Sequence, residues 1–143
     1  MSKKRLNKEW KALQEEKDAG TLGFKINPTD DKMLKWNAVI KGPVNTVWKD
    51  LIINIDITIP QQYPFKAPIP IITSPIMHPN ILDGAVCLSS IVLWTPAKNI
   101  KDILLEIISK LEVPDWENRV ITEPHDREEF LKQANLYTLK NIL

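Results

Sequence analysis

Near the start of the chain, apolar residues recur at the spacing of a helix. Leu6, Trp10 and Leu13 fall on one face of a helix predicted over residues 2–19, and charged residues surround them. Gly20 follows at the position where many helices end. The first turns are strongly basic, which opposes the helix dipole. This basic face is either a solvated surface or a docking patch for another protein.

The next part of the chain changes to the period of β-strands. Residues 33–41 and 51–59 alternate apolar and polar side chains, which is typical of strands with one buried face. Residues 69–73 predict a further strand, and residues 24–27 a short first one. Short connections between successive strands favour an antiparallel meander. The inward positions of the two long strands are Leu34, Trp36, Ala38 and Ile40, then Leu51, Ile53, Ile55, Ile57 and Ile59.

A proline-rich stretch follows the strands. Six prolines between residues 60 and 79 exclude a helix and stiffen the backbone. Pro64 and Pro68 bracket Phe65, which should hold this loop in an extended form. Residues 74–98 show no clean period, so no regular element is predicted there.

Two helices are predicted after this irregular stretch. Residues 100–111 carry a continuous apolar stripe that must cover the sheet, and Asn99 is a plausible N-cap. Asp126 and Glu129 form a variant of a capping box that opens a last helix, which extends to about Lys140. The face of this last helix is predicted to hold Phe130, Ala134 and Tyr137. A helix, then strands, then helices predict an α+β domain of two layers.

Composition and charge restrict what this domain can be. With 143 residues, 43% of them hydrophobic, the chain is expected to form a single domain over residues 1–143. A net charge of +1 gives no sign of a nucleic-acid or membrane-surface binder, and no apolar run is long enough to span a bilayer. One cysteine and two histidines, far apart, predict no metal site, and we expect no cofactor. The low cysteine content favours a cytoplasmic protein, or a nuclear one if the source is eukaryotic.

The candidate chemistry lies in the irregular stretch. Cys87, the only cysteine, follows the segment His78-Pro79-Asn80 and precedes Trp94-Thr95-Pro96-Ala97. A free cysteine by itself is often a core residue. Its position in a glycine-containing loop between a strand and an amphipathic helix instead favours an accessible thiol.

These motifs, in their order along the chain, resemble the ubiquitin-conjugating enzymes. The similar segments are KKRLNKEWKALQ, KWNAVIKGP, YPFKAP, HPNI with GAVCL, and WTPAKNIKDILL. The resemblance runs over nearly the whole chain. It implies a fold with an N-terminal helix, a four-stranded antiparallel meander sheet, a long central helix packed on the sheet and a C-terminal helix.

The resemblance also implies roles for the residues of the HPN motif and the cysteine. Cys87 would accept a ubiquitin-like protein as a thioester from an activating enzyme and pass it to a lysine amine or to a ligase. The amide of Asn80 would donate to the oxyanion formed as a lysine attacks, or would hold the loop in shape, and both roles are compatible. His78 and Pro79 would anchor and stiffen the loop.

The chain departs from the family pattern near the thiol. His78 and Cys87 are nine positions apart and Cys87 and Trp94 seven, one fewer in each case than in most relatives. The segment EVPDWENRV replaces the usual acidic, proline-rich loop. Asp115 and Glu117 are its candidates for orienting or deprotonating the incoming lysine. The segment before Asp126 is several residues short, so the penultimate helix is predicted to be clipped or missing.

A docking surface for ligases and the activating enzyme carries over from the resemblance. Phe65 is the main candidate anchor, although a phenylalanine in this loop could also fill the core. We expect a monomer that works with ubiquitin or a ubiquitin-like protein, an activating enzyme, a RING-type ligase and a protein substrate, without nucleic acid or membrane. The matching positions are Lys4, Arg5, Lys8, Phe65, Lys66, Pro96 and Ala97.

Two other functions stay open on the sequence. A non-enzymatic adaptor of the same fold would typically lack the cysteine, so Cys87 argues against it. A thiol hydrolase would need a histidine base, and His78 and His125 are the only choices. The sequence does not identify the modifier, the ligase or the substrate.

Overall fold

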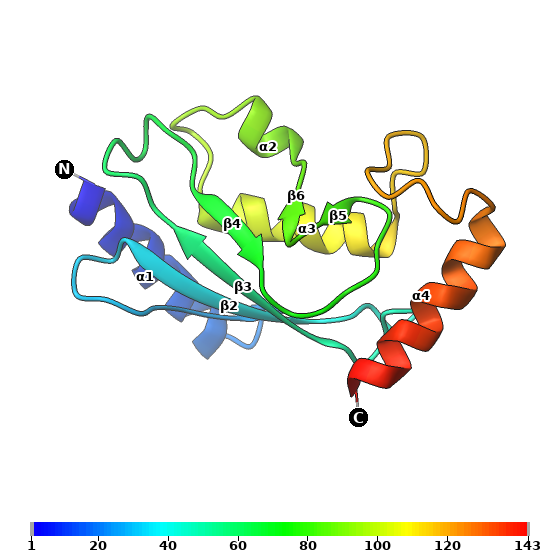
Figure 1. Ribbon diagram of the computed structural model, residues 1–143. Helices are drawn as coiled ribbons and strands as arrows, with labels where there is room; N and C mark the ends of the chain where they lie inside the picture. Colours follow the sequence, from blue (N-terminus) through cyan, green and yellow to red (C-terminus); the bar gives the residue numbers. More distant parts are fainter. Residues whose placement is uncertain (1, 143) are drawn as a thin grey trace.

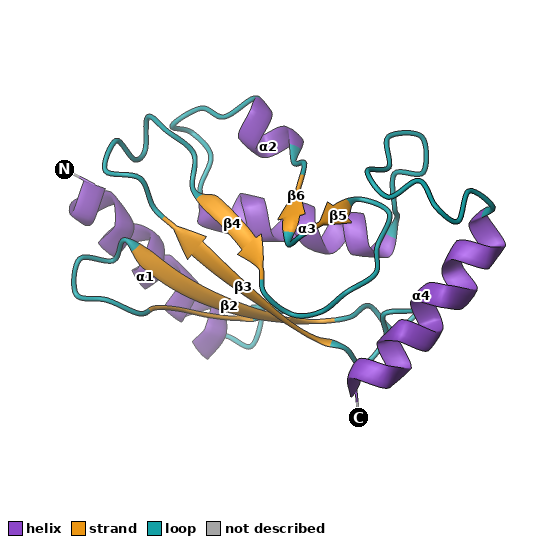
Figure 2. Ribbon diagram, in the orientation of Figure 1, coloured by secondary structure: helices purple, strands orange, loops and turns teal. Residues whose placement is uncertain are grey.

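The computed structural model describes residues 2–142, which form a main four-stranded sheet, a small two-stranded sheet and helices packed against them (Figure 1). The helices and strands that the sequence predicts follow in the predicted order, and β5, β6 and α2 are additional. Figure 2 shows α4 at the far end of the molecule from α1. The helices α1 and α3 are neighbours, because Glu9 and Glu16 of α1 contact Ile100 and Lys101 of α3. The elements are α1 (Ser2–Asp18), β1 (Lys25–Pro28), β2 (Lys35–Lys41), β3 (Ile52–Thr58), β4 (Ile69–Ile72), β5 (Ile81–Leu82), β6 (Ala85–Val86), α2 (Ser89–Val92), α3 (Ile100–Glu112) and α4 (Arg127–Ile142).

The four long strands form the predicted antiparallel meander, in the order β1-β2-β3-β4. Their side chains alternate between a buried and an exposed face, as the period-two pattern requires. The strand predicted over residues 33–41 begins only at Lys35, because Met33 has a positive φ of 59°. The Met33 carbonyl there accepts a hydrogen bond of 2.7 Å from the buried indole N–H of Trp36. This turn fixes where the second strand starts.

One hydrophobic core joins the sheet to the helices. The buried residues of α1, α3 and α4 belong to the same cluster as the buried face of the sheet. The predicted N-cap is confirmed: Asn99 Oδ1 accepts from the Asp102 N–H at 2.8 Å, and Asp102 Oδ2 accepts from the Asn99 N–H at 2.9 Å. The stripe on α3 therefore packs as predicted, with Ile100, Ile103, Leu104, Ile107 and Leu111 all buried.

The last helix differs from its prediction in one position. Asp126 Oδ2 accepts from the Glu129 N–H at 3.0 Å, so the predicted cap is present. Phe130 and Ala134 are buried, but Tyr137 is 39% exposed and Thr138 is buried in its place. Both residues lie within one helical step of Ala134, at three and four positions, so the sequence alone did not decide between them.

The stretch without a clean period contains regular structure after all. Residues 74–98 hold a second, two-stranded sheet of β5 and β6 and the short helix α2. The penultimate helix is missing, as predicted: between α3 and α4 the described chain runs through turns and bends only. These two irregular segments lie around the thiol.

Candidate active site

The β5–β6 hairpin presents the only cysteine of the chain. Its turn is made by Asp83 and Gly84, with φ of 50° and 82°, the combination that a tight hairpin of this kind needs. A Cβ on Gly84 would lie 2.3 Å from the Ile72 carbonyl oxygen, so only glycine fits against β4. Cys87 comes directly after β6 and is exposed, while the next residue, Leu88, is buried. The thiol therefore faces solvent on a firmly seated backbone.

A glutamate of α3 holds the segment that follows the thiol. Glu106 accepts from the backbone N–H groups of Ser89, at 2.7 Å, and Ser90, at 2.8 Å. Burial tends to raise the pKa of Glu106, but the hydrogen bonds from Ser90 and Ser89 outweigh it and lower that pKa below its ordinary value. The ionised carboxylate thus ties α2 to the central helix.

The histidine before the thiol is buried and fully hydrogen-bonded. His78 is 1% exposed, and its Nδ1 accepts from the Asn80 N–H at 3.0 Å. Its Nε2 therefore carries the hydrogen and donates to the Lys110 carbonyl at 3.0 Å. Burial lowers the pKa of His78 from 6.5 to about 4, assisted by the charge of Lys110 and opposed by the hydrogen bond to its carbonyl. The neutral ring joins the loop before the thiol to the end of α3.

This buried histidine predicts a pH dependence of stability. Between pH 6.5 and about 4 the unfolded chain binds a proton at this position and the folded chain does not. The free energy of unfolding should therefore stay flat above pH 6.5 and fall by roughly 3 kcal/mol as the pH drops to 4. The lowered pKa of Glu106 adds its own loss only at the acidic end of this range. Urea titrations at intervals from pH 7.5 to 4.5 measure the slope.

The matched control for the pH titration replaces the other histidine. His125→Gln should retain the slope between pH 6.5 and 5, because His125 lies exposed near the start of α4. A wild-type protein whose stability does not change across this range would contradict a neutral His78.

The amide of Asn80 is bonded on both sides to one loop. Its Oδ1 accepts from the Asp115 N–H at 2.9 Å, and its Nδ2 donates to the Asp115 carbonyl at 2.9 Å and to the Asn118 carbonyl at 3.5 Å. The side chain is nearly buried, with 3% exposed. Pro79 adds two contacts to the same loop, since its carbonyl accepts from the N–H groups of Val120 and Ile121 at 2.8 and 3.2 Å. The HPN segment and the 113–121 loop therefore form one hydrogen-bonded unit.

An aromatic side chain fixes the other side of this loop. The Trp116 ring packs edge-on against Phe130 of α4, with ring centroids 5.6 Å apart. The guanidinium groups of Arg119 and Arg127 lie 5.7 and 5.0 Å from the centre of the Trp116 ring. This stack anchors the loop to α4 in the absence of the penultimate helix.

The two acidic candidates on the loop occupy different surroundings. The Asp115 carboxylate accepts from the side chain and backbone of Asn118 at 3.1 and 3.2 Å. These contacts, chiefly the side-chain bond, lower the pKa of Asp115, with a smaller contribution from the charge of Lys110. Asp115 also lines a cavity of about 420 Å³ together with Cys87 and Asn80. Glu117 is exposed and is not among the residues that line this cavity.

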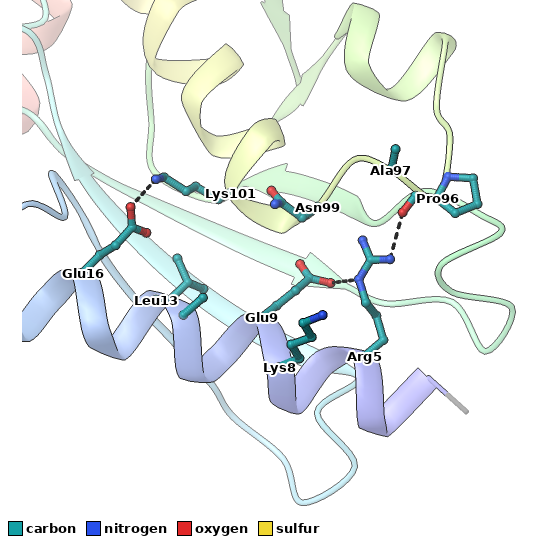
Figure 3. Close-up of a pocket in the computed structure, with 10 residues that line it drawn as sticks. Arg5, Lys8, Glu9, Leu13, Glu16, Pro96, Ala97, Asn99 and Lys101 are labelled. Atoms are coloured by element: carbon teal, nitrogen blue, oxygen red, sulfur yellow. Dashed lines mark hydrogen bonds and ion pairs between the residues drawn. The ribbon is translucent and has the colours of Figure 1, made fainter.

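Four of the seven predicted docking residues line a second groove, between α1 and the loop before α3, whereas Lys4, Phe65 and Lys66 are not among its lining residues. The groove has a volume of about 310 Å³ and is lined by Arg5, Lys8, Pro96 and Ala97 among others (Figure 3). The Arg5 guanidinium is already engaged there, donating to the carbonyls of Pro96 at 2.8 Å and Lys98 at 2.6 Å. Lys4, Lys8, Phe65, Lys66, Pro96 and Ala97 are exposed, and 70% of Phe65 is accessible.

A carboxylate that lines this groove was not predicted from the sequence. Glu9 accepts from Arg5 Nε at 2.9 Å, from the Tyr63 hydroxyl at 2.5 Å and from the Ile100 N–H at 2.9 Å. Burial, followed by the bond to Glu9, raises the pKa of Tyr63. Trp94 joins the segment before α3 to the YPFKAP loop, because its indole N–H donates to the Pro64 carbonyl at 2.8 Å. Glu9 and Trp94 thus join the first helix, the YPFKAP loop and the start of α3.

Some of these unpredicted features left a signal in the sequence and others did not. Asp83-Gly84 is a recognised hairpin dipeptide and could have predicted the β5–β6 turn. Glu9, Glu106 and Trp116 act on residues far away in the sequence or on a neighbouring helix, so no local pattern marks them.

Two further properties of residues 2–142 concern metals and membranes. No cluster of three or more histidine, cysteine, aspartate or glutamate side chains in this part of the chain could hold a metal ion. None of its helices is both long and apolar enough to cross a membrane.

Comparisons with known proteins identify the family of the chain. The sequence profile of the family described as ubiquitin-conjugating enzyme matches residues 5–138. The chain is 38% identical over 118 residues to "Ubiquitin conjugating enzyme E2 B" of Dictyostelium discoideum, covering 78% of this chain and 80% of the relative. It is 35% identical over 116 residues to "Ubiquitin-conjugating enzyme E2 1" of Caenorhabditis elegans, covering 80% of this chain and 59% of that protein.

A solved structure gives the same result for the fold. The ubiquitin conjugating enzyme domain of Toxoplasma gondii superposes with a TM-score of 0.84 at 28% identity, covering 98% of each chain. The chain therefore belongs to the ubiquitin-conjugating enzyme family. Its members are transferases that act through a cysteine thioester, and ubiquitin, activating enzymes and ligases are their general partners.

Proposed function

We propose that Cys87 is the residue that carries ubiquitin, or a ubiquitin-like protein, as a thioester. The observation that carries this proposal is an exposed thiol on a fixed hairpin, opening into a cavity that Asn80 and Asp115 also line. No other cysteine is available in the chain. In the transfer step an amine nitrogen attacks the thioester carbonyl, a C–N bond forms, and the sulfur of Cys87 leaves as a thiolate.

The surroundings of the thiol favour this role over a thiol hydrolase. A hydrolase needs a histidine that accepts the proton of the thiol. Both ring nitrogens of His78 are already bonded, to the Asn80 N–H and the Lys110 carbonyl. His125 contacts Arg119 in the segment before α4, and it does not line the cavity of the thiol. Without such a base the thioester should persist until an amine arrives.

We assign Asn80 and Asp115 to the transfer step, with Glu117 as a second acidic candidate. Asn80 holds Asp115 through two backbone hydrogen bonds of 2.9 Å, which supports a role in shaping the loop. Its Nδ2 would also donate to the oxyanion, replacing the long 3.5 Å contact to Asn118. Asp115 lines the cavity and its lowered pKa keeps the carboxylate ionised, so it would orient the ammonium of an incoming lysine. His78 and Pro79 would support this unit from beneath.

We further propose that the exposed residues of the docking surface meet a RING-type ligase and, on the first helix, the activating enzyme. Lys4, Lys8 and Lys66 would supply positive charge, and Phe65, Pro96 and Ala97 apolar contact. Arg5 would mainly hold the Pro96 loop in position for the partner, because its guanidinium donates to the Pro96 and Lys98 carbonyls. The protein would act as a monomer on protein substrates. A thiol that must return to its reduced form suits the cytoplasm.

Phe65→Ala should weaken ligase-stimulated transfer and leave the fold intact. With 70% of its surface accessible, the ring makes little contribution to the core, whereas an interface anchor typically costs about 2 kcal/mol or more when truncated. Discharge rates with and without a RING-type ligase, together with thermal melting, measure both effects. Lys4→Glu should act in the same direction.

Val44→Ala is the matched control for the ligase experiment. Val44 is 73% exposed and lies in the turn between β2 and β3, outside the docking surface. Its substitution should leave ligase stimulation unchanged. If Phe65→Ala unfolds the protein, or if both variants respond equally to the ligase, Phe65 is not a docking anchor.

A further inference from the structure

A tryptophan follows directly after the acidic candidate that lines the cavity of the thiol. Trp116 is half-buried and packs against the hydrophobic core, whereas Glu117 and Asn118 after it are exposed. Its ring meets the buried ring of Phe130 in α4 edge-on, with 5.6 Å between the centroids. The turn that carries Asp115 is thus attached to α4 through one side chain.

Two guanidinium groups complete this stack. Those of Arg127 and Arg119 lie 5.0 and 5.7 Å from the centre of the Trp116 ring. Neither arginine belongs to the two ion pairs found among residues 2–142, so no carboxylate there competes with the ring for these cations. Arg119 also donates to the His125 carbonyl at 2.5 Å, in the segment that enters α4. The loop and the start of α4 therefore hold each other through a ring and through a backbone contact.

The backbone and the carboxylate of Asp115 are restrained by different residues. Asn80 fixes the backbone of Asp115 through two hydrogen bonds of 2.9 Å. The carboxylate is restrained by Asn118, whose side chain and backbone N–H donate to it at 3.1 and 3.2 Å. Trp116 lies between Asp115 and Asn118 in the chain, so the position of its ring decides how Asn118 meets the carboxylate. Releasing the ring would leave the backbone of Asp115 in place and free its carboxylate.

We propose that Trp116 is a positioning residue for the transfer step, which directs the Asp115 carboxylate into the cavity of the thiol by anchoring the 115–118 turn to α4. This inference rests on the proposed roles of Cys87 and Asp115. Trp116 is not among the residues that line the cavity, so it acts on the reaction through Asp115 and does not touch the reacting atoms. The packing of α4 thereby helps to set the rate of transfer to lysine.

Loss of the Trp116 ring should slow transfer without affecting charging. A misplacement of about 1 Å at an oriented site costs roughly a hundredfold in rate. The carboxylate that would orient the incoming amine is the group that the stack restrains. The thiol itself is held by other contacts, those of Gly84 against β4 and of Glu106 with the Ser89 N–H. The two half-reactions should therefore respond differently to the same substitution.

The test loads the full chain with ubiquitin, purifies the thioester and measures its single-turnover discharge over a range of free lysine concentrations, without a ligase. Trp116→Ala should lower the maximal rate about tenfold to a hundredfold, while the thioester forms at the wild-type rate.

Trp10→Ala is the matched control for this experiment. Trp10 on α1 is also half-buried and also meets another ring edge-on, that of Trp36, with 5.7 Å between the centroids. The control should lose stability in thermal melting, as Trp116→Ala does, but should discharge at the wild-type rate. Equal slowing of both variants would mean that lost stability, and not positioning, sets the rate, and would overturn the inference.

A double-mutant cycle shows whether Trp116 acts through Asp115. Asp115→Ala should itself discharge slowly, and adding Trp116→Ala should slow it by less than about threefold more, because the carboxylate to be positioned is gone. A further loss as large as the one that Trp116→Ala causes alone would overturn the inference, since the two residues would then act independently.

Arg119→Ala is a milder variant that serves in the cycle if Trp116→Ala does not fold. It removes one guanidinium from the ring and the contact with the His125 carbonyl, and it should slow discharge in the wild-type background but not in Asp115→Ala. Wild-type discharge by Trp116→Ala, or by Arg119→Ala where Trp116→Ala is unfolded, would overturn the inference while Asp115→Ala stays slow. If Asp115→Ala discharges normally, or if no thioester forms, the assignment of Asp115 or of Cys87 fails and this inference falls with it.

Discussion

Cys87→Ala should abolish adduct formation with ubiquitin entirely. The reason is chemical: this chain has one thiol, and neither an alanine methyl group nor any neighbouring side chain of the cavity can form a thioester. With activating enzyme and ATP, the wild-type protein should give a band that reducing agent cleaves. The same reaction with Cys87→Ala should give no such band at any time point.

Cys87→Ser tests whether the adduct is attached through the sulfur atom. A serine hydroxyl on the same hairpin is a weaker nucleophile, but any ester that it forms resists reducing agent. The variant should therefore give either no adduct or a slowly formed, reductant-resistant one. Because Cys87 is exposed, neither substitution creates a cavity in the core, and both variants should melt close to the wild-type temperature. A thiol-sensitive adduct in Cys87→Ala would contradict the mechanism.

Asn80→Ala should charge normally at Cys87 but discharge to free lysine about a hundredfold to a thousandfold more slowly. Losing one oxyanion donor typically has an effect of this size in acyl-transfer sites. The substitution also removes the two bonds of 2.9 Å to the Asp115 backbone, so the acidic loop should loosen. Single-turnover discharge of the purified thioester measures the rate separately from charging.

Amide hydrogen exchange distinguishes the two roles of Asn80. Faster exchange at the Asp115 N–H, whose acceptor is Asn80 Oδ1, would report loss of loop order. A slow variant with normal exchange would assign the effect to the oxyanion alone. Asn141→Ala, at the exposed end of α4, is the control and should alter neither quantity. Discharge of Asn80→Ala at the wild-type rate would exclude Asn80 from the transfer step.

The Trp116 stack explains how the loop between α3 and α4 keeps its position without a helix. The described chain between α3 and α4 contains no helix. The Trp116 ring, packed on Phe130 and flanked by two guanidinium groups, provides apolar contact with α4. A shortened loop can thus still present Asp115 at the cavity, because one aromatic side chain anchors it on one side and Asn80 on the other.

Local chemistry explains why most elements were predictable from the sequence. Strands with one buried face are predicted by the alternation of apolar and polar residues. From Ile53 to Ile57 every second side chain is buried, as this alternation requires. The cap of α3 could be predicted because both of its residues lie within four positions: Asn99 and Asp102 accept hydrogen bonds from each other's backbone N–H groups. The proline-rich segment and the missing penultimate helix follow equally from residue types and chain length.

The sequence was less informative where the deciding partner lies elsewhere in the chain. The phase of α4 was misassigned at Tyr137 because only packing chooses between two positions one residue apart. The short strands and helix of residues 81–92 have no period of their own and depend on outside contacts, such as Gly84 against Ile72 and Glu106 beneath Ser89. Glu9, which joins three segments, looks in the sequence like any charged residue of an exposed helix.

The sequence by itself determined the order of elements, the single thiol and the motifs around it, because these depend on residue type and on neighbours within a few positions. Only the tertiary structure decided which side chains meet at the thiol. It brings Asn80, Asp115 and Lys110 to the same cavity and leaves Glu117 outside it. The physical reason is that Asn80 lies 35 positions before Asp115, and His78 lies 32 positions before Lys110. Long-range hydrogen bonds of His78 and Asn80 set their positions.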